Sequence, residues 1–355
     1  MTHRLWPRAS ALTLSLLAAG CKDSNGPESY NPMATSQTAA QAYGAVQNNK
    51  AVQSLDVLGS AFTLTGATAP LPFPAPAPDY SAFRTVPPEL LNTLQRLERL
   101  ATTFSAASPQ DLFPSTVRGK TFVYNPQTAR YAPSDRTGAP ANGVRFMLYA
   151  VDPVLKRVVT PLQEVGYLDL TDKGSNTLGI KAVITSVTPN VTALEYDATG
   201  AIGTSGFTFS AKGYVSDGTT RLDFDLSLSL AAATGLKIDY KITQQAKNLS
   251  IHVVATGTTS NTGNVTLTIT EGSNNLEVAA IGTNTSVSGT IKYNGSTVAT
   301  ISGKPENPVF TGANGKVLTA DDLIGLKNLF DFVDKLFDGF DDLLLPAFFV
   351  FGISA

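Results

Sequence analysis

The stretch Arg-Leu-Asp-Phe-Asp-Leu-Ser-Leu-Ser-Leu, residues 221–230, alternates strictly between polar and apolar side chains. Successive side chains of a β-strand point to opposite faces of a sheet, so this stretch has one apolar and one polar side. It predicts a strand in a sheet with one dry face and one solvated face. Leu226 is then expected to be buried, and Asp225, one position along, to face solvent.

The same two-residue period continues on both sides of this stretch. After it, alternation recurs in residues 236–242, 249–253, 265–269 and 276–280, and before it in 144–151, 156–162 and 165–170. Residues that close hairpins lie at Asp152-Pro153, Asp217-Gly218, Gly263-Asn264, 272–275 and Asn294-Gly295. Strand, short turn and strand in repeated succession predict an antiparallel meander that starts near Lys120. The pattern leaves open whether the sheet stays open or closes on itself.

Helical periodicity flanks the meander on its N-terminal side. A helix is predicted over residues 36–58 and a second over 87–104, where Pro87-Pro88 suits a first turn. Between them, residues 69–78 have proline at alternate positions, which excludes a helix or a central strand and predicts a stiff connector.

The C-terminal region is predicted to form an amphipathic helix, with Thr319 as its cap and acids in its first turn. Its apolar side has three columns at seven-residue spacing: Leu323, Phe330, Phe337 and Leu344; Leu326, Val333 and Phe340; Leu329, Leu336 and Leu343. Pro346 is expected to end it, with a short strand after that. The helix could lie on a membrane, bind a partner's groove or cover the sheet. We favour the last, because seven Asp against two Lys would be repelled by anionic lipid.

These patterns together predict an α+β protein, mostly β. Its long antiparallel meander sheet is expected to curl around, or pack on, N-terminal helices and the amphipathic C-terminal helix. Residues 36–118 form the helical and Pro-rich segment, and residues 119–355 form the β domain with the C-terminal helix. We expect these two parts to make one structural unit.

The N-terminus has the pattern of a secretory signal peptide. A short basic start is followed by an apolar run at residues 11–17 and by small residues 18–20, directly before Cys21. The apolar run is far shorter than the roughly 20 residues that span a bilayer as a helix. Residues 1–20 are therefore expected to be removed, and residues 21–35, which are mostly polar and aperiodic, to act as a flexible tether.

The segment Leu17-Ala18-Ala19-Gly20-Cys21 resembles the lipobox of bacterial lipoproteins, whose cysteine is acylated and becomes the mature N-terminus. That motif usually has Leu three positions before the cysteine, whereas this chain has Ala18 there. The resemblance implies lipid attachment at Cys21, the only cysteine of the chain. Lys22 stands where inner-membrane retention signals have Asp, which implies the outer membrane, with the protein facing the periplasm or the cell surface.

Charge and residue counts argue against several function classes. Without the signal peptide the chain has 24 basic and 28 acidic residues and no run of Lys and Arg, unlike a nucleic-acid-binding protein. Only His252 remains after cleavage, and Cys21 is assigned to lipid, so the usual zinc or iron ligand sets cannot form. No Gly-x-Ser-x-Gly motif accompanies His252, which we expect to be a solvent-facing strand residue. We expect no cofactor, no metal and no catalytic residue.

Carboxylates are the remaining candidates for chemistry. Acid and base for glycoside cleavage could come from a set of five: Glu164, Asp169, Asp172, Glu195 and Asp197. Sequence spacing does not give their separation across strands. The acidic side of the C-terminal helix lacks the Gly-turned loop of a calcium site and is interpreted as a solvated face.

The sequence therefore favours a lipid-anchored cell-envelope protein that is a non-enzymatic structural or binding module. Its expected partners are the membrane, through the lipid, and an envelope protein or lipophilic ligand. The alternative is a carrier or chaperone for lipophilic molecules, with a cavity between a curved sheet and the C-terminal helix. Phe330, Phe337 and Phe340 would then form the hydrophobic ligand face.

Overall fold

The computed structural model describes most of the predicted β region and parts of its flanks. The described residues are 31, 33–34, 37–38, 40–41, 44, 49–55, 57–58, 112–113, 115–174, 178–203, 206–231, 235–257, 262–283, 285–304, 307–313, 317–326, 328, 343–344 and 346–347. Asn31–Ala355 belong to one compact unit. The signal peptide, Cys21, the connector at 69–78, the helix at 87–104, and Phe330, Phe337 and Phe340 lie outside the described residues.

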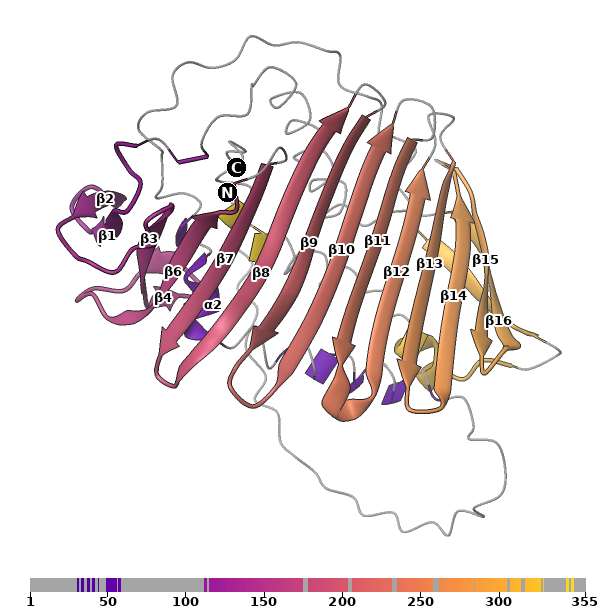
Figure 1. Cartoon of the computed structure of the whole chain (residues 1–355). Helices are drawn as coiled ribbons and strands as arrows, with labels where there is room; N and C mark the ends of the chain where they lie inside the picture. Colours follow the sequence, from indigo (N-terminus) through magenta and orange to yellow (C-terminus); the bar gives the residue numbers. More distant parts are fainter. Residues whose placement is uncertain are drawn as a thin grey trace, which may run out of the picture. The chain divides into compact units, whose positions relative to one another are not determined.

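Fifteen strands form one sheet (Figure 1). They are β1 (Thr121–Asn125), β2 (Arg130–Ser134), β3 (Gly143–Tyr149), β6 (Glu164–Asp172), β7 (Leu178–Val187), β8 (Asn190–Gly203), β9 (Gly206–Ser216), β10 (Arg221–Ala231), β11 (Gly235–Gln244), β12 (Leu249–Gly257), β13 (Gly263–Glu271), β14 (Asn274–Gly282), β15 (Val287–Tyr293), β16 (Ser296–Lys304) and β17 (Asn307–Gly312). Two short strands, β4 (Val151–Asp152) and β5 (Arg157–Val158), pair with each other in a separate hairpin. The 3-10 helix η2 (Gln245–Lys247) joins β11 to β12.

The predicted antiparallel meander is confirmed. From β6 to β17 each strand pairs antiparallel with the next strand of the chain, as the neighbouring arrows of Figure 1 show. At the other end the order is β6-β3-β1-β2, and β1 pairs with β3 in parallel, so the sheet is mixed. The sheet is open, and its edge strands β2 and β17 each contain a proline, Pro133 and Pro308. Proline has no N–H to offer a further strand, which protects an exposed edge from additional pairing.

The two faces of the sheet differ as the alternation predicts. In β10, Leu222, Phe224, Leu226 and Leu228 are buried, whereas Asp225 and Ser227 between them are exposed. In β12 every second residue from Leu249 to Gly257 is buried. The core therefore lies on one face of the sheet, which we call the apolar face.

A short helix, α2 (Lys50–Gln53), packs on the apolar face against β6, β7 and β8. Asn49 caps it, because its Oδ1 accepts from the backbone N–H groups of Ala51 at 2.9 Å and Val52 at 3.4 Å. Ala51 is fully buried over Gly166 of β6, where an added Cβ would lie 3.3 Å from the Ala51 Cβ and 2.3 Å from the Thr185 carbonyl oxygen. A glycine is favoured there chiefly because a side chain would overlap the β7 backbone, and the close approach of the helix narrows the remaining space.

The C-terminal segment also meets the apolar face. Thr319 caps a helix as predicted, since its Oγ1 accepts from the Asp322 N–H at 3.1 Å. Leu326, Leu343, Leu344 and Ala347 are buried, and the Ala347 N–H donates to the hydroxyl of buried Tyr196 in β8 at 3.2 Å.

Tyr196 and Phe224 approach each other above a glycine. Gly213 of β9 is paired with Tyr196 on one side and with Phe224 on the other. The two ring centroids lie 6.1 Å apart, and a Cβ added at Gly213 would lie 2.5 Å from the Tyr196 Cβ. A side chain at Gly213 would overlap the backbone of β8, because an added Cβ would also lie 2.0 Å from the Glu195 carbonyl oxygen.

The expected curling of the sheet around helices is not supported. β-Bulges are the main local feature that bends a sheet, and they are seen as shifts in the pairing register. Among the described strands such shifts occur only in the pairs β3·β6, β7·β8 and β15·β16. All pairs from β8 to β15 run without such a shift. Apolar alternation predicts which face is buried, but it does not report curvature.

Several boundaries also differ from the prediction. Gly263 and Asn264, expected in a turn, are the first residues of β13 because they pair with both β12 and β14. Of the strand expected at 156–162, only Arg157 and Val158 form one, in the separate hairpin. Pro346 is itself helical and does not end the helix there, and Leu323, in one of the apolar columns, is exposed.

Candidate functional site

The face opposite the apolar face, which we call the polar face, is crossed by one register row of charged and hydroxyl side chains. From β7 to β16 the directly paired residues are Lys181, Asp197, Lys212, Asp225, Lys241, His252, Thr268, Glu277, Lys292 and Thr297. The charges alternate in sign over the first five residues and again from Glu277 to Lys292. We call this row the charge ladder. Opposite charges on directly paired residues favour this register over a slipped one.

Members of the charge ladder form ion pairs with direct or diagonal neighbours. Lys212 Nζ lies 2.6 Å from Asp225 Oδ2, and Lys292 Nζ lies 3.1 Å from Glu277 Oε1. Lys181 turns diagonally to Glu195, at 2.5 Å. These side chains are largely solvated, so each pair contributes little by itself to stability.

His252 lies on the polar face, as predicted, and has a carboxylate partner that the sequence did not reveal. Its Nε2 is 2.8 Å from Asp239 Oδ1, one strand away and two residues along. Lys241 and Thr268 stand directly opposite it. Among the described residues no serine or threonine hydroxyl bonds to the His252 ring, so this histidine and aspartate lack the nucleophile of a catalytic triad.

The five carboxylates considered for glycoside cleavage do not come together as an acid and base. Each accepts from donors of its own: Glu164 from Arg136, Asp169 from Arg145, Asp172 from the N–H groups of Leu112 and Gly174, Glu195 from Lys181 and Tyr214, and Asp197 from Lys173. A general acid requires a raised carboxyl pKa. The hydrogen bond from Lys181 instead lowers the pKa of Glu195.

Two arginines lie over tyrosine rings on the polar face. The guanidinium carbon of Arg145 is 3.9 Å from the ring centroid of Tyr167, and that of Arg221 is 3.7 Å from the centroid of Tyr214. Arg145 also holds Asp169 through two hydrogen bonds of 2.6 and 2.7 Å. Stacking and bidentate pairing fix these side chains across strands. Sequence spacing could not find them, because they depend on the register between strands.

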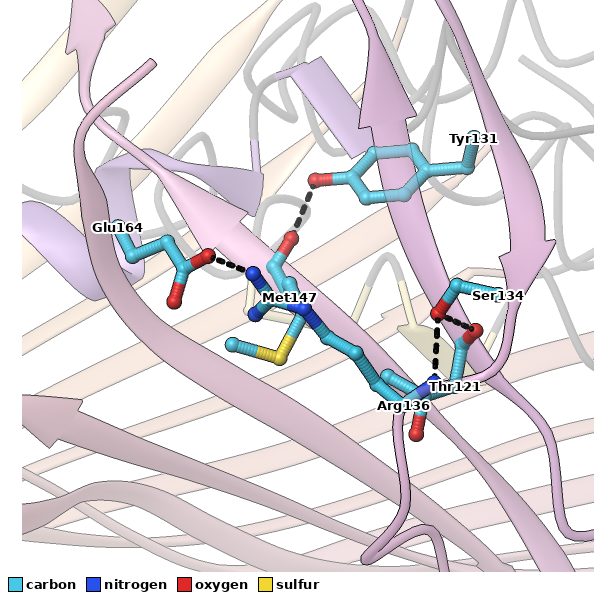
Figure 2. A network of polar contacts seen from close by, with 6 residues as sticks. All are labelled: Thr121, Tyr131, Ser134, Arg136, Met147 and Glu164. Carbon is cyan, nitrogen blue, oxygen red and sulfur yellow. Dashed lines mark hydrogen bonds and ion pairs between the residues drawn. The ribbon is translucent and has the colours of Figure 1, made fainter.

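A further polar network ties the β2 edge to the rest of the sheet (Figure 2). The Tyr131 hydroxyl donates to the Met147 carbonyl at 2.9 Å, and Arg136 forms a 2.6 Å ion pair with Glu164. Burial raises the pKa of Tyr131, which keeps the phenol protonated as a donor. Ser134 Oγ donates to the Thr121 carbonyl at 2.9 Å. The network holds β1 and β2 against β3 and β6.

Within the described part of the chain, no group of three or more His, Cys, Asp and Glu side chains is arranged to hold a metal ion. In the same residues, no helix combines the length and apolar character that crossing a bilayer would need. The predicted lipid site at Cys21 and the predicted ligand face at Phe330, Phe337 and Phe340 lie outside the described residues. Comparison with protein-family models, curated proteins and solved structures gives no match.

Proposed function

We propose that the protein is a lipid-anchored cell-envelope protein that acts as a non-enzymatic structural or binding module. The observation that carries the proposal is the charge ladder with its neighbouring ion pairs. The acids and bases of this face are bonded to one another rather than directed at a common point. A catalytic centre instead gathers groups whose pKa values are displaced toward proton transfer. The polar face suits a solvated outer surface with a fixed register.

The attachment to a membrane rests on Cys21. The chain carries more acidic than basic residues, so its net charge would not attract it to anionic lipid. An acyl chain adds apolar area that partitions into the bilayer, and two or more anchoring signals make attachment stable. The lipobox resemblance supplies such a signal at the position where the signal peptide would be removed.

The test of attachment is metabolic labelling with palmitate, followed by membrane fractionation. Cys21→Ser should abolish the label and release the protein or leave it unprocessed. A matched control combines Cys21→Ser with Ser24→Cys, which restores a thiol three positions away. This control should stay unlabelled, because the motif specifies the position of the cysteine. Label and membrane association in the Cys21→Ser protein would rule out the anchor.

One observation favours the carrier as a second candidate function. Gln244, at the end of β11, is 5% exposed on the apolar face, and its Oε1 has no hydrogen-bond donor among the residues that the structure describes. A buried acceptor without a donor costs about 1–3 kcal/mol. A lipophilic ligand with a hydroxyl or amide head group could donate to this oxygen.

Native mass spectrometry of the purified processed protein, with Gln244→Leu as the variant, separates the two candidates. A carrier should show a bound lipophilic mass that Gln244→Leu loses. A structural module should show the protein mass alone, and Gln244→Leu should then be neutral or stabilising, because it removes an unsatisfied acceptor.

A further inference from the structure

The hairpin formed by β4 and β5 displays large apolar side chains to solvent. We call residues 150–163 the apolar hairpin. Val154 is 69% exposed, Leu155 55%, Val159 41% and Leu162 37%. In Figure 1, β4 lies beside β3 and β6, at the β2 end of the sheet. Scattered exposed apolar residues are common, but four within nine residues of one hairpin form a cluster that needs an explanation.

A well-formed turn holds these side chains in place. Asp152 Oδ1 accepts from the N–H groups of Val154 at 2.8 Å and Leu155 at 3.0 Å. The Lys156 N–H donates to the Asp152 carbonyl at 2.9 Å, and Lys156 has φ of 51°. At the base, the Val159 N–H donates to the Ala150 carbonyl at 2.9 Å. The hairpin backbone is thus ordered while its apolar tip points away from the core, so less ordering is needed when the tip meets a partner.

The charge around the apolar hairpin is opposite to that of the chain as a whole. Residues 115–163 contain seven Lys and Arg and two Asp, whereas the complete chain has a net charge of −2. Two of these arginines, Arg136 and Arg145, are ion-paired with Glu164 and Asp169, which leaves a smaller basic excess. Lys156 and Arg157 directly follow the apolar tip and are exposed. This local excess is not visible as a run of basic residues, because it is spread over β1 to β5.

We propose that the apolar hairpin is a second membrane contact, in which Val154 and Leu155 enter the interfacial region of a bilayer that contains anionic phospholipid. Lys156 and Arg157 then lie at the level of the head groups, where long basic side chains keep their charge solvated. Apolar tip and basic flank are the two features that interfacial segments combine. The proposal rests on the proposed function for its membrane, since one acyl anchor is strengthened by a second signal.

The processed protein offers a clean reporter for this contact. Trp6 is the only tryptophan of the chain and belongs to the expected signal peptide. Leu155→Trp therefore gives a processed protein with a single tryptophan, at the tip of the hairpin. The matched control is Val317→Trp, at a residue that is 85% exposed and lies just before the C-terminal helix. Both full-length lipidated proteins are mixed with vesicles of phosphatidylcholine alone or with added phosphatidylglycerol.

The expected result is a blue shift of the Leu155→Trp emission, and quenching by brominated lipid, that are larger with phosphatidylglycerol. Val317→Trp should show neither effect. Adding Lys156→Glu and Arg157→Glu to the Leu155→Trp protein should reverse the preference for anionic vesicles. Equal shifts for both reporters would mean that tethering alone is seen, and would overturn the proposal. Absence of a shift with either vesicle would also overturn it and would favour a protein partner for the hairpin.

Failure here is distinguishable from failure of the proposed function. Palmitate labelling of Cys21 and mass measurement report the anchor independently of the hairpin. If the protein is labelled but the Leu155→Trp emission does not shift with vesicles, the lipid anchor is supported and the hairpin contact is refuted. An unlabelled protein whose emission still shifts with anionic vesicles retains the hairpin contact without the anchor.

Discussion

Truncation of Leu226 should destabilise the protein far more than truncation of its neighbour Asp225. Leu226 is 3% exposed on β10, between Ala211 and Tyr240 on the adjacent strands. Leu226→Ala should cost about 2–5 kcal/mol, because it loses the transfer free energy of the side chain and leaves a cavity. We expect the upper half of this range, since the paired strands run without a bulge on either side and have little freedom to collapse inward.

Asp225→Ala should leave stability unchanged within error. Asp225 faces solvent and, among the described residues, bonds to Lys212; their side chains are 51% and 76% exposed. Such an ion pair is screened and contributes little. Urea unfolding followed by circular dichroism measures both variants. With a slope of about 3 kcal/mol per molar urea, a cost of about 4 kcal/mol lowers the midpoint by about 1.3 M. Equal shifts for both variants would mean that the polar face is covered too, and the one-sided core would be wrong.

Three further predictions concern single contacts. Tyr196→Phe should cost about 1–3 kcal/mol and speed amide exchange at Ala347, whose N–H loses its acceptor; unchanged exchange would contradict this docking. Gly213→Ala should cost roughly 1–3 kcal/mol by overpacking, and a neutral urea melt would be the opposing result. At pH 7 Glu195→Gln should melt below the wild type, because the Lys181 hydrogen bond lowers the Glu195 pKa. The difference in stability between the wild type and Glu195→Gln should be complete above the ordinary carboxyl pKa of 4.5 and should disappear as the pH falls through the lowered pKa of folded Glu195. A difference in stability that persists at pH 2 would refute this role of the ion pair.

Local pattern was sufficient to predict most of the meander. The alternation at residues 221–230 identified β10 and its buried face, and Asn294-Gly295 forms the expected turn, with φ of 49° and 79°. Each of these features depends on neighbouring residues alone. Gly263-Asn264 shows the limit of local evidence, because pairing with β12 and β14 extends the strand over residues that would otherwise favour a turn.

Features that depend on how one strand is paired with another were not predictable. The parallel pairing of β1 with β3, the stacking of Arg221 on Tyr214 and the His252–Asp239 contact all require the register of two or more strands. The apolar hairpin is a different case. Residues 156–162 have the alternation of a strand, but alternation does not indicate which sheet a strand joins. Here only Arg157 and Val158 form a strand, in a hairpin outside the main sheet.

The chain-order connectivity of β6 to β17 has a consequence for how the sheet is made and how it changes. Each strand from β7 to β16 pairs with the strands just before and after it, so contacts within the meander are short in sequence, a property that favours fast folding. A chain that is synthesised from its N-terminus therefore has each neighbouring strand already present when the next one pairs. Inserting or deleting two consecutive strands preserves the direction of all others, as in repeat proteins whose units contact only their neighbours. The width of this sheet is therefore a quantity that gene duplication can alter in steps of one hairpin.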